Sequence, residues 1–174
     1  TNDINLSHTN ANAVANSLTT GTGNIDFTQT GAFTLGITSA LTTTSGNVTI
    51  SNDNGNLTAG TVTAGGVGDI SLSTPTSGNI SVDSVTASGN QVTINSSGNV
   101  TENGDAGVDI TADSLVIDAV SGVGSGNAME TTVAFLDIQN TTSNDVGINE
   151  TSAVTVTLID AGPGTVDLDA GGNI

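Results

Sequence analysis

The acidic side chains are the residues of this chain whose types could do chemistry. The sequence of 174 residues contains 17 Asp and Glu residues and a single histidine, His8, but no cysteine, lysine or arginine. Carboxylates bind divalent cations, and pairs of carboxylates hydrolyse glycosidic bonds. A Ser-His-Asp triad would have to use His8, and no pattern around it positions the other members. Cation binding is thus the candidate chemistry, beside the simpler interpretation that the carboxylates are solvated turn residues, and we expect no enzymatic activity.

Three stretches in the middle of the chain share one apolar pattern. In Leu57–Ala64, Ile80–Ala87 and Ile110–Ile117, apolar residues recur with the same spacing around a small or acidic pair. Self-similarity at a period of about 20–30 residues is typical of a repeat architecture. Gly-Asn pairs such as Gly46-Asn47 precede several of the short alternating segments, and both residue types tolerate the positive φ of a tight corner.

These repeats predict an all-β fold, a right-handed parallel β-helix (β-solenoid) without helices. We expect about 20–23 residues per coil and roughly eight coils, stacked at the ordinary strand spacing of about 4.8 Å. The apolar residues are mainly Val, Ile, Leu and Ala, with three Phe and no Trp or Tyr, and this set suits a narrow interior filled layer by layer. We expect residues 1–174 to form a single solenoid segment, a fragment or processed piece of a longer repeat protein.

Three acidic residues are the candidate metal ligands. Asp83 and Asp113 occupy the same position in two of the aligned stretches, at a corner between strands. Like charges stacked on a ladder destabilise it, and Ca²⁺, which prefers carboxylate and carbonyl oxygens, would relieve the repulsion. Asp69 is the third candidate because Gly65–Leu72 is similar to a glycine-rich Ca²⁺-binding nonapeptide, although it lacks one residue. The alternative is that all three are solvated turn residues.

Charge and composition restrict the partners and the location. The formal net charge of −17, without any Lys or Arg, excludes nucleic-acid binding because phosphate contacts depend on those residues. No apolar run reaches the roughly 18 residues that a membrane-spanning helix needs, so we expect no membrane insertion. A chain rich in Thr, Asn and Gly and free of Cys favours a secreted, extracellular or cell-surface location.

The repeats resemble those of a known family. The form GNI-x-V/L followed by D-S-V/L-x-A/I is similar to the right-handed parallel β-helix repeats of filamentous-haemagglutinin-type exoproteins, best between Gly46 and Ala119. These are large secreted adhesins of bacterial two-partner secretion and related autotransporter passengers. The resemblance implies a cell-surface or secreted location and a role in adhesion, aggregation or surface structure. The chain departs from the family in lacking Lys and Arg and in its uneven coil lengths.

Three functions are consistent with these observations. The first is a structural or adhesive rod that self-associates end to end or laterally, presents loops such as Gly122–Asn127, and contacts a glycan or cell-surface partner. The second is a glycan-binding or carbohydrate-active module, although the aromatic residues on which sugar rings stack are scarce. The third is a spacer that stiffens when Ca²⁺ occupies acidic corners, which chelation would reveal.

Overall fold

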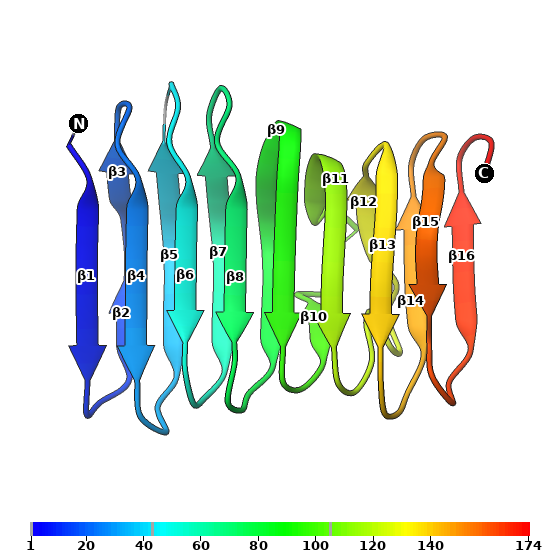
Figure 1. Ribbon diagram of the computed structural model, residues 1–174, viewed down its shortest axis with the longest axis horizontal. Helices are drawn as coiled ribbons and strands as arrows, with labels where there is room; N and C mark the ends of the chain where they lie inside the picture. The colour runs from blue at the N-terminus through cyan, green and yellow to red at the C-terminus, as the bar shows by residue number, and fades with distance from the viewer. Residues whose placement is uncertain (1, 43, 105) are drawn as a thin grey trace.

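The computed structural model is an elongated β-solenoid in which parallel strands wind around one long axis (Figure 1). It describes residues 2–42, 44–104 and 106–174. No helix occurs in these three ranges, and the chain makes about 8 turns. The predicted fold class, a parallel all-β solenoid of roughly eight coils, is confirmed.

Sixteen strands form this solenoid, and all of their pairings are parallel. They are β1 (Ile4–Thr9), β2 (Ala13–Ala15), β3 (Leu18–Thr20), β4 (Ile25–Thr30), β5 (Leu35–Thr42), β6 (Val48–Asn52), β7 (Leu57–Ala64), β8 (Ile70–Thr74), β9 (Ile80–Ser96), β10 (Val100–Glu102), β11 (Ile110–Ala119), β12 (Met129–Thr132), β13 (Phe135–Asn140), β14 (Val146–Glu150), β15 (Thr155–Asp160) and β16 (Val166–Ala170).

Each coil contributes segments to three ladders of hydrogen-bonded strands. Ladder 1 contains β1, β4, β6, β8, the ends of β9 and β11, β13 and β15. Ladder 2 begins with β2 and continues through the first parts of β5, β7 and β9 to β10. Ladder 3 contains β3, the later parts of β5, β7 and β9, the start of β11, and β12. β14 and β16 are continuous across ladders 2 and 3.

The period of the repeat can be measured along ladder 1. Its first inward residues follow one another at intervals of 20 to 23 positions, namely Ile4, Ile25, Val48, Ile70, Val92, Leu115, Leu136 and Val156. The predicted coil length of about 20–23 residues is therefore confirmed.

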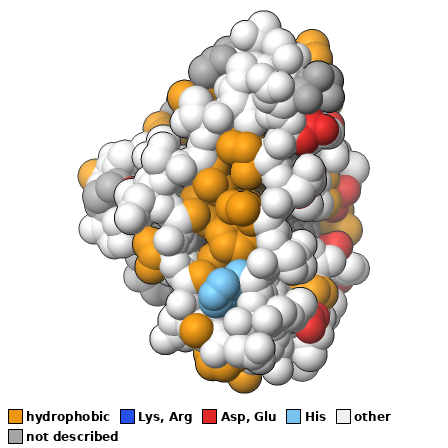
Figure 2. Space-filling view, turned by 90° about the vertical axis from the view of Figure 1, so that its left-hand side faces the viewer, with side chains coloured by type: hydrophobic (Ala, Val, Ile, Leu, Met, Phe, Trp, Pro, Cys, Tyr) orange, Lys and Arg blue, Asp and Glu red, His pale blue; other side chains and the backbone are white. Residues whose placement is uncertain are grey.

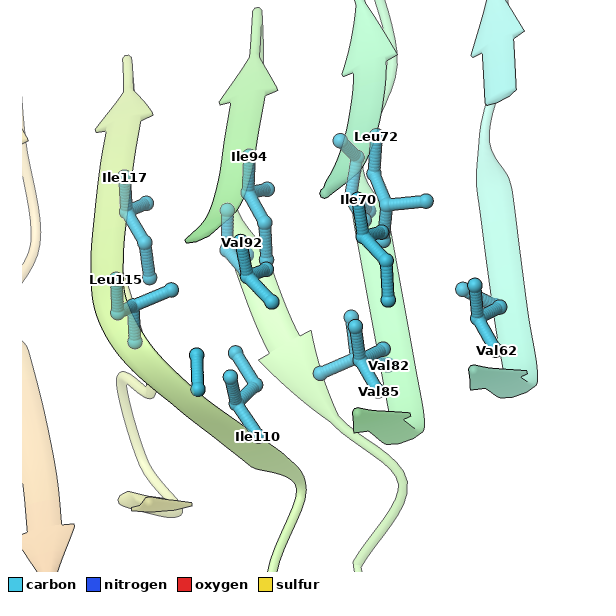
Figure 3. Packing of buried hydrophobic residues seen from close by; sticks show 14 of the residues in the cluster. Val62, Ile70, Leu72, Val82, Val85, Val92, Ile94, Ile110, Leu115 and Ile117 are labelled. Carbon is cyan, nitrogen blue, oxygen red and sulfur yellow. The ribbon is translucent and has the colours of Figure 1, made fainter. Parts of the chain in front are cut away.

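The interior is a continuous column of aliphatic side chains. Inward residues alternate with outward ones along each strand, and stacking places each inward side chain on its equivalent in the next coil. Figure 3 shows this packing in the middle of the rod for Val62, Ile70, Leu72, Val82, Val85, Val92, Ile94, Ile110, Leu115 and Ile117. Burial of this column supplies the main favourable free energy of folding.

A stack of buried polar side chains closes the corner between ladders 1 and 2 from inside. Gln29, Asn52, Thr74, Ser96 and Asn140 are each at most 2% exposed. Their amide or hydroxyl groups donate hydrogen bonds to backbone carbonyls of the corner. Asn52 Nδ2, for example, lies 2.9 Å from Phe33 O and 2.8 Å from Asn56 O. The corner backbone, which leaves the strand ladders, is thereby satisfied.

The Gly-Asn pairs build a second, outer ladder at the corners. The Oδ1 atom of Asn24 accepts from the backbone N–H of Asn47 at 2.9 Å, and Asn47 Oδ1 accepts from Asp69 N at 3.0 Å. We call this arrangement the corner ladder. Its glycines allow close backbone approach, since a Cβ on Gly46 would lie 2.3 Å from Gly23 O.

The structure corrects our explanation of the asparagines in these pairs. Positive φ was predicted for both members of a Gly-Asn pair. Gly46 has a φ of 123°, but among the described non-glycine residues only Asn10 and Asn144 have positive φ. Four asparagines of Gly-Asn pairs serve instead as hydrogen-bond acceptors between coils, namely Asn24, Asn47, Asn56 and Asn79.

One of the three superimposed stretches, Ile110–Ile117, is misplaced. Leu57 pairs with Ile80 as predicted, but Ile110 pairs with Val85, and Ile80 pairs with Val100. The same apolar spacing arises around any corner of the solenoid, so the pattern did not specify which corner a stretch occupies.

The predicted protruding loop Gly122–Asn127 also needs correction. Val123 is fully buried and bridges Val100 and Val146, so the start of this segment belongs to the coil. Only Ser125, Gly126 and Asn127 are exposed.

Candidate cation site

The structure separates the acidic residues that we selected from the sequence. Asp83 is half-buried at the corner between the ladder 2 and ladder 3 parts of β9. Asp113 is exposed and lies at a different corner, between the ladder 3 and ladder 1 parts of β11. The two residues are therefore not equivalent positions on neighbouring coils. Ca²⁺ binding by either residue stays a prediction.

Asp69 belongs to the corner ladder. It is exposed, its backbone N–H donates to Asn47 Oδ1, and its own Oδ1 accepts from Gln91 N at 3.0 Å. Like the neutral side chains of Asn24 and Asn47, this carboxylate accepts a hydrogen bond from a backbone N–H of the next coil. The corner ladder explains why an acidic residue follows glycines in Gly65–Leu72, the segment similar to a Ca²⁺-binding nonapeptide. Ca²⁺ binding at Asp69 likewise stays a prediction.

A different set of carboxylates comes together in the fifth and sixth coils. Glu102, Asp109 and Glu130 each offer an oxygen atom, and these atoms all lie within 4.8 Å of one another. We call these three residues the acidic triad. Among the described residues, no other group of three or more potential metal ligands is this close.

The solenoid itself brings two members of the acidic triad together. Asp109 directly precedes β11, and Glu130 lies in β12, the next strand of ladder 3. Asp109 N donates to Glu130 O at 2.8 Å, and Glu130 N donates to Asp109 Oδ2 at 2.8 Å. The backbones of the two residues, and the Asp109 side chain, are thus fixed on neighbouring coils.

The third member comes from an enlarged corner. Glu102 ends β10, and residues 103–109 separate it from β11, whereas Gly60 alone occupies the corresponding corner between the paired parts of β7. The Oε1 atom of Glu102 accepts from the amide of Asn127, in the corner of the next coil. Two enlarged corners therefore meet over the acidic triad.

Burial makes the charge of Asp109 unfavourable. Its side chain is 1% exposed, and burial raises its pKa from an ordinary 3.8 to about 7. The hydrogen bond from Glu130 N opposes this rise, whereas the nearby carboxylates of Glu102 and Glu130 add to it. A cation at this position would stabilise the ionised form.

One oxygen of the acidic triad lacks a hydrogen bond. The Oε2 atom of Glu130 is buried, and no donor among the described residues reaches it. The Glu130 side chain is also in hydrogen-bonding contact with the Asp109 carboxyl, and this contact contributes to the raised pKa of Asp109, so a proton shared by the two carboxylates can serve as the partner. Glu150 offers a contrast, because its buried carboxylate accepts from Thr131 Oγ1, Val133 N and Ser152 N.

A polar pocket is lined by residues that include Asn127, the hydrogen-bond partner of Glu102. It is lined in part by Gly124, Asn127, Asp145, Thr165 and Asp167. The backbone N–H of Thr165 donates to Asp145 Oδ1 at 2.8 Å, and this hydrogen bond lowers the pKa of Asp145. Asp145, like Asp69, is therefore a corner carboxylate that accepts a hydrogen bond from the backbone of the next coil.

Comparison of the chain with protein-family models, curated proteins and solved structures finds no match. The acidic triad is accordingly interpreted from its own geometry. No helix in the described ranges is long and apolar enough to cross a membrane.

The acidic triad was missed in the sequence, although a signal for it exists. Asp109-Ile-Thr-Ala and Glu130-Thr-Thr-Val both place an acid two residues before a Thr, and Ile110 pairs with Thr131. This similarity emerges only when coils are aligned by ladder position. Glu102 has no comparable signal, because enlarged corners occur at this position in the fifth and sixth coils but not in the second to fourth.

Proposed function

We propose that the chain is a structural rod of an extracellular surface protein or fibre, comparable in role to the filamentous-haemagglutinin-type exoproteins that its repeats resemble. The observation that carries this proposal is the single hydrophobic cluster that extends from β4 to the loop after β15. A continuous interior holds each coil at a fixed distance from the next, about 4.8 Å, and so gives the rod a defined length.

End-to-end self-association is the second part of the proposal. Figure 2 shows hydrophobic side chains in a band on the end face at β1, with His8 beside them. Ile4, Ala13 and Leu18 of the first coil and Ile159 and Leu168 of the last coil are only partly buried. An open strand edge with apolar inward residues pairs readily with a further strand, so a second copy is the expected partner.

The surface offers little for stacking sugar rings, which favours the rod over the carbohydrate-binding alternative. Phe27 is 6% exposed and Phe33 is half-buried, so Phe135, at 45% exposed, is the main accessible aromatic side chain. Trp and Tyr, which usually supply such platforms, are absent from the sequence.

Sedimentation and electron microscopy over a range of protein concentrations would test the proposal. We expect linear oligomers whose length increases with concentration. Leu6, which lies opposite Phe27 and is 40% exposed, is the site of a blocking variant, Leu6→Asp. An inward charge on an edge strand opposes pairing, so this variant should remain monomeric.

Val67→Asp is the matched control, since Val67 is 78% exposed at a corner in the middle of the rod. It should assemble like the unmodified chain. A chain that stays monomeric at high concentration would contradict end-to-end association. A monomer that binds immobilised glycans would support the carbohydrate-binding alternative instead.

A further inference from the structure

The chain contains two Asn-Gly steps, Asn54-Gly55 and Asn103-Gly104. Asparagine followed by glycine is the sequence most prone to spontaneous deamidation, because glycine has no Cβ to hinder attack of its backbone nitrogen on the preceding side chain. In a folded protein the reaction also requires that this stretch of backbone can leave its native hydrogen bonds. The two steps share one chemistry but lie in different surroundings.

Asn54-Gly55 is held between neighbouring coils. Asn54 forms a β-bridge with Ser77, and its Oδ1 atom accepts from the Ser77 hydroxyl. The backbone N–H of Gly55, whose nitrogen would be the nucleophile, donates to Ser77 O at 2.9 Å. On its other side, Gly55 lies so close to Phe33 O that a Cβ would overlap this oxygen. Attack by Gly55 N would therefore require the coils to separate.

Asn103-Gly104 lies in the enlarged corner that follows β10. Both residues are exposed and lie outside the strands, and a Cβ on Gly104 would have no other atom within 4 Å. The backbone N–H of Gly104 donates to the carboxylate of Glu102, two residues earlier in the chain. This hydrogen bond can open by rotation of a half-buried side chain, without separating any coils.

We propose that Asn103 is a site of spontaneous deamidation, with water as the co-reactant, and that Asn54 is protected by its contacts with the next coil. The observation that carries the proposal is the hydrogen-bond partner of each glycine nitrogen. This partner is a carbonyl of the next coil for Gly55 and a local side chain for Gly104. Hydrogen bonds between packed coils open rarely, whereas exposed corners open locally and often.

The reaction needs only the chain and water. Gly104 N attacks Cγ of Asn103, and the new C–N bond closes a succinimide ring. The Cγ–Nδ2 bond breaks, and Nδ2 leaves as ammonia with the proton that Gly104 N gives up. Water then opens the ring at either carbonyl, which leaves an aspartyl or an isoaspartyl linkage at residue 103.

Deamidation would add one negative charge to the enlarged corner. The formal net charge of −17 would become −18, since one neutral amide is replaced by one carboxylate. The new carboxylate would directly follow Glu102, a member of the acidic triad, and would add to the repulsion there. This inference is independent of the proposed rod function, because Asn103 lies in the fifth coil, away from both ends of the rod.

Incubation of the folded chain at neutral pH, followed by proteolysis and tandem mass spectrometry, tests the proposal. A Glu-specific protease suits a chain without Lys or Arg, and it separates Asn54, in residues 1–102, from Asn103, in residues 103–130. We expect Asn103 to deamidate at least about tenfold faster than Asn54. Anion-exchange chromatography of the intact protein should show a more acidic species that accumulates at the same rate.

The urea-unfolded chain is the control, because unfolding removes the coil contacts of Asn54. There the two steps should react at rates within about threefold of each other. Asn103→Gln, a change at an exposed residue that should fold normally, should remove the fast-forming acidic species. The proposal would be overturned if Asn54 reacted as fast as Asn103 in the folded chain. It would also be overturned if Asn103 stayed unmodified over a period in which the unfolded chain reacts.

Discussion

Buried amides and hydroxyls at single positions decide how the corner between ladders 1 and 2 is closed. Asn52 is fully buried and uses both hydrogens of its amide on the carbonyls of Phe33 and Asn56. Its apolar neighbours in the same strand, Val48 and Ile50, point into the same interior. A polar side chain therefore lies at the edge of an otherwise aliphatic column because the corner backbone needs donors.

Asn52→Leu should lower the free energy of unfolding by roughly 1–3 kcal/mol, since Phe33 O loses the donor that the amide supplies, whereas Asn56 O keeps the backbone N–H of Leu35. Chemical denaturation monitored by circular dichroism would measure this loss. Asn95→Leu is the control, because Asn95 is exposed on an outward position of ladder 1 and should change stability by less than about 0.5 kcal/mol. Equal losses in both variants would refute the role assigned to the buried amide.

At the residue scale the sequence allowed only part of the site to be predicted. It indicated that carboxylates at corners matter, but it selected Asp83 and Asp113 from a superposition that joins different corners. Asp109 and Glu130 could have been paired through coil register, whereas Glu102 ends β10 and pairs with neither of them in a ladder. The period of the apolar residues contains no information about its approach.

At the scale of the strand and its corner, glycine is needed where neighbouring backbones nearly touch. Gly46 has a φ of 123°, and a Cβ there would lie 2.3 Å from Gly23 O. Gly89 has a φ of 77°, but a Cβ at this residue would have no other atom within 4 Å. Substitution of Gly89 should therefore report the effect of backbone conformation on stability alone. Substitution of Gly46 should report the added effect of close stacking.

Gly89→Ala should reduce stability by about 1 kcal/mol through its backbone conformation alone. Gly46→Ala should reduce it by about 2–4 kcal/mol, because the corner must also move away from the preceding coil. Thermal and urea unfolding of both variants would measure the difference. Similar losses would show that close stacking at the corner contributes little.

The sequence shows that a segment is a strand more readily than it shows where that strand bends around a corner. The alternation of apolar residues in Ile70–Thr74 and Val48–Asn52 indicates strands directly, since each reads inward and outward in turn. Other elements run through corners without a break, as β9 does from Ile80 to Ser96 across parts of all three ladders. A local pattern cannot locate such a bend, because the turn is made by stacking on the coils above and below.

At the scale of the whole molecule, each coil contacts mainly its neighbours, so coils should be removable as units. Deleting residues 48–69 joins Asn47 to Ile70, which occupies the same ladder position as Val48. The product should fold into a rod shorter by about 4.8 Å. Small-angle X-ray scattering would give the length and circular dichroism the strand content.

Deleting residues 48–58 is the control for this prediction. It joins Asn47 to Ala59, which belongs to ladder 2, so the ladders after the junction lose their register. This variant should be largely unfolded. Equal folding of both deletions would contradict the modular description.

The corner ladder has a consequence for any filament that the chain builds. Asp3 accepts from Asn24, Asn24 from Asn47, Asn47 from Asp69, and Asp69 from Gln91. The later coil donates at each of these four steps, so the rod has a direction and two chemically different tips. A filament of such rods would be polar, and its growth, capping or attachment to a surface would distinguish one tip from the other.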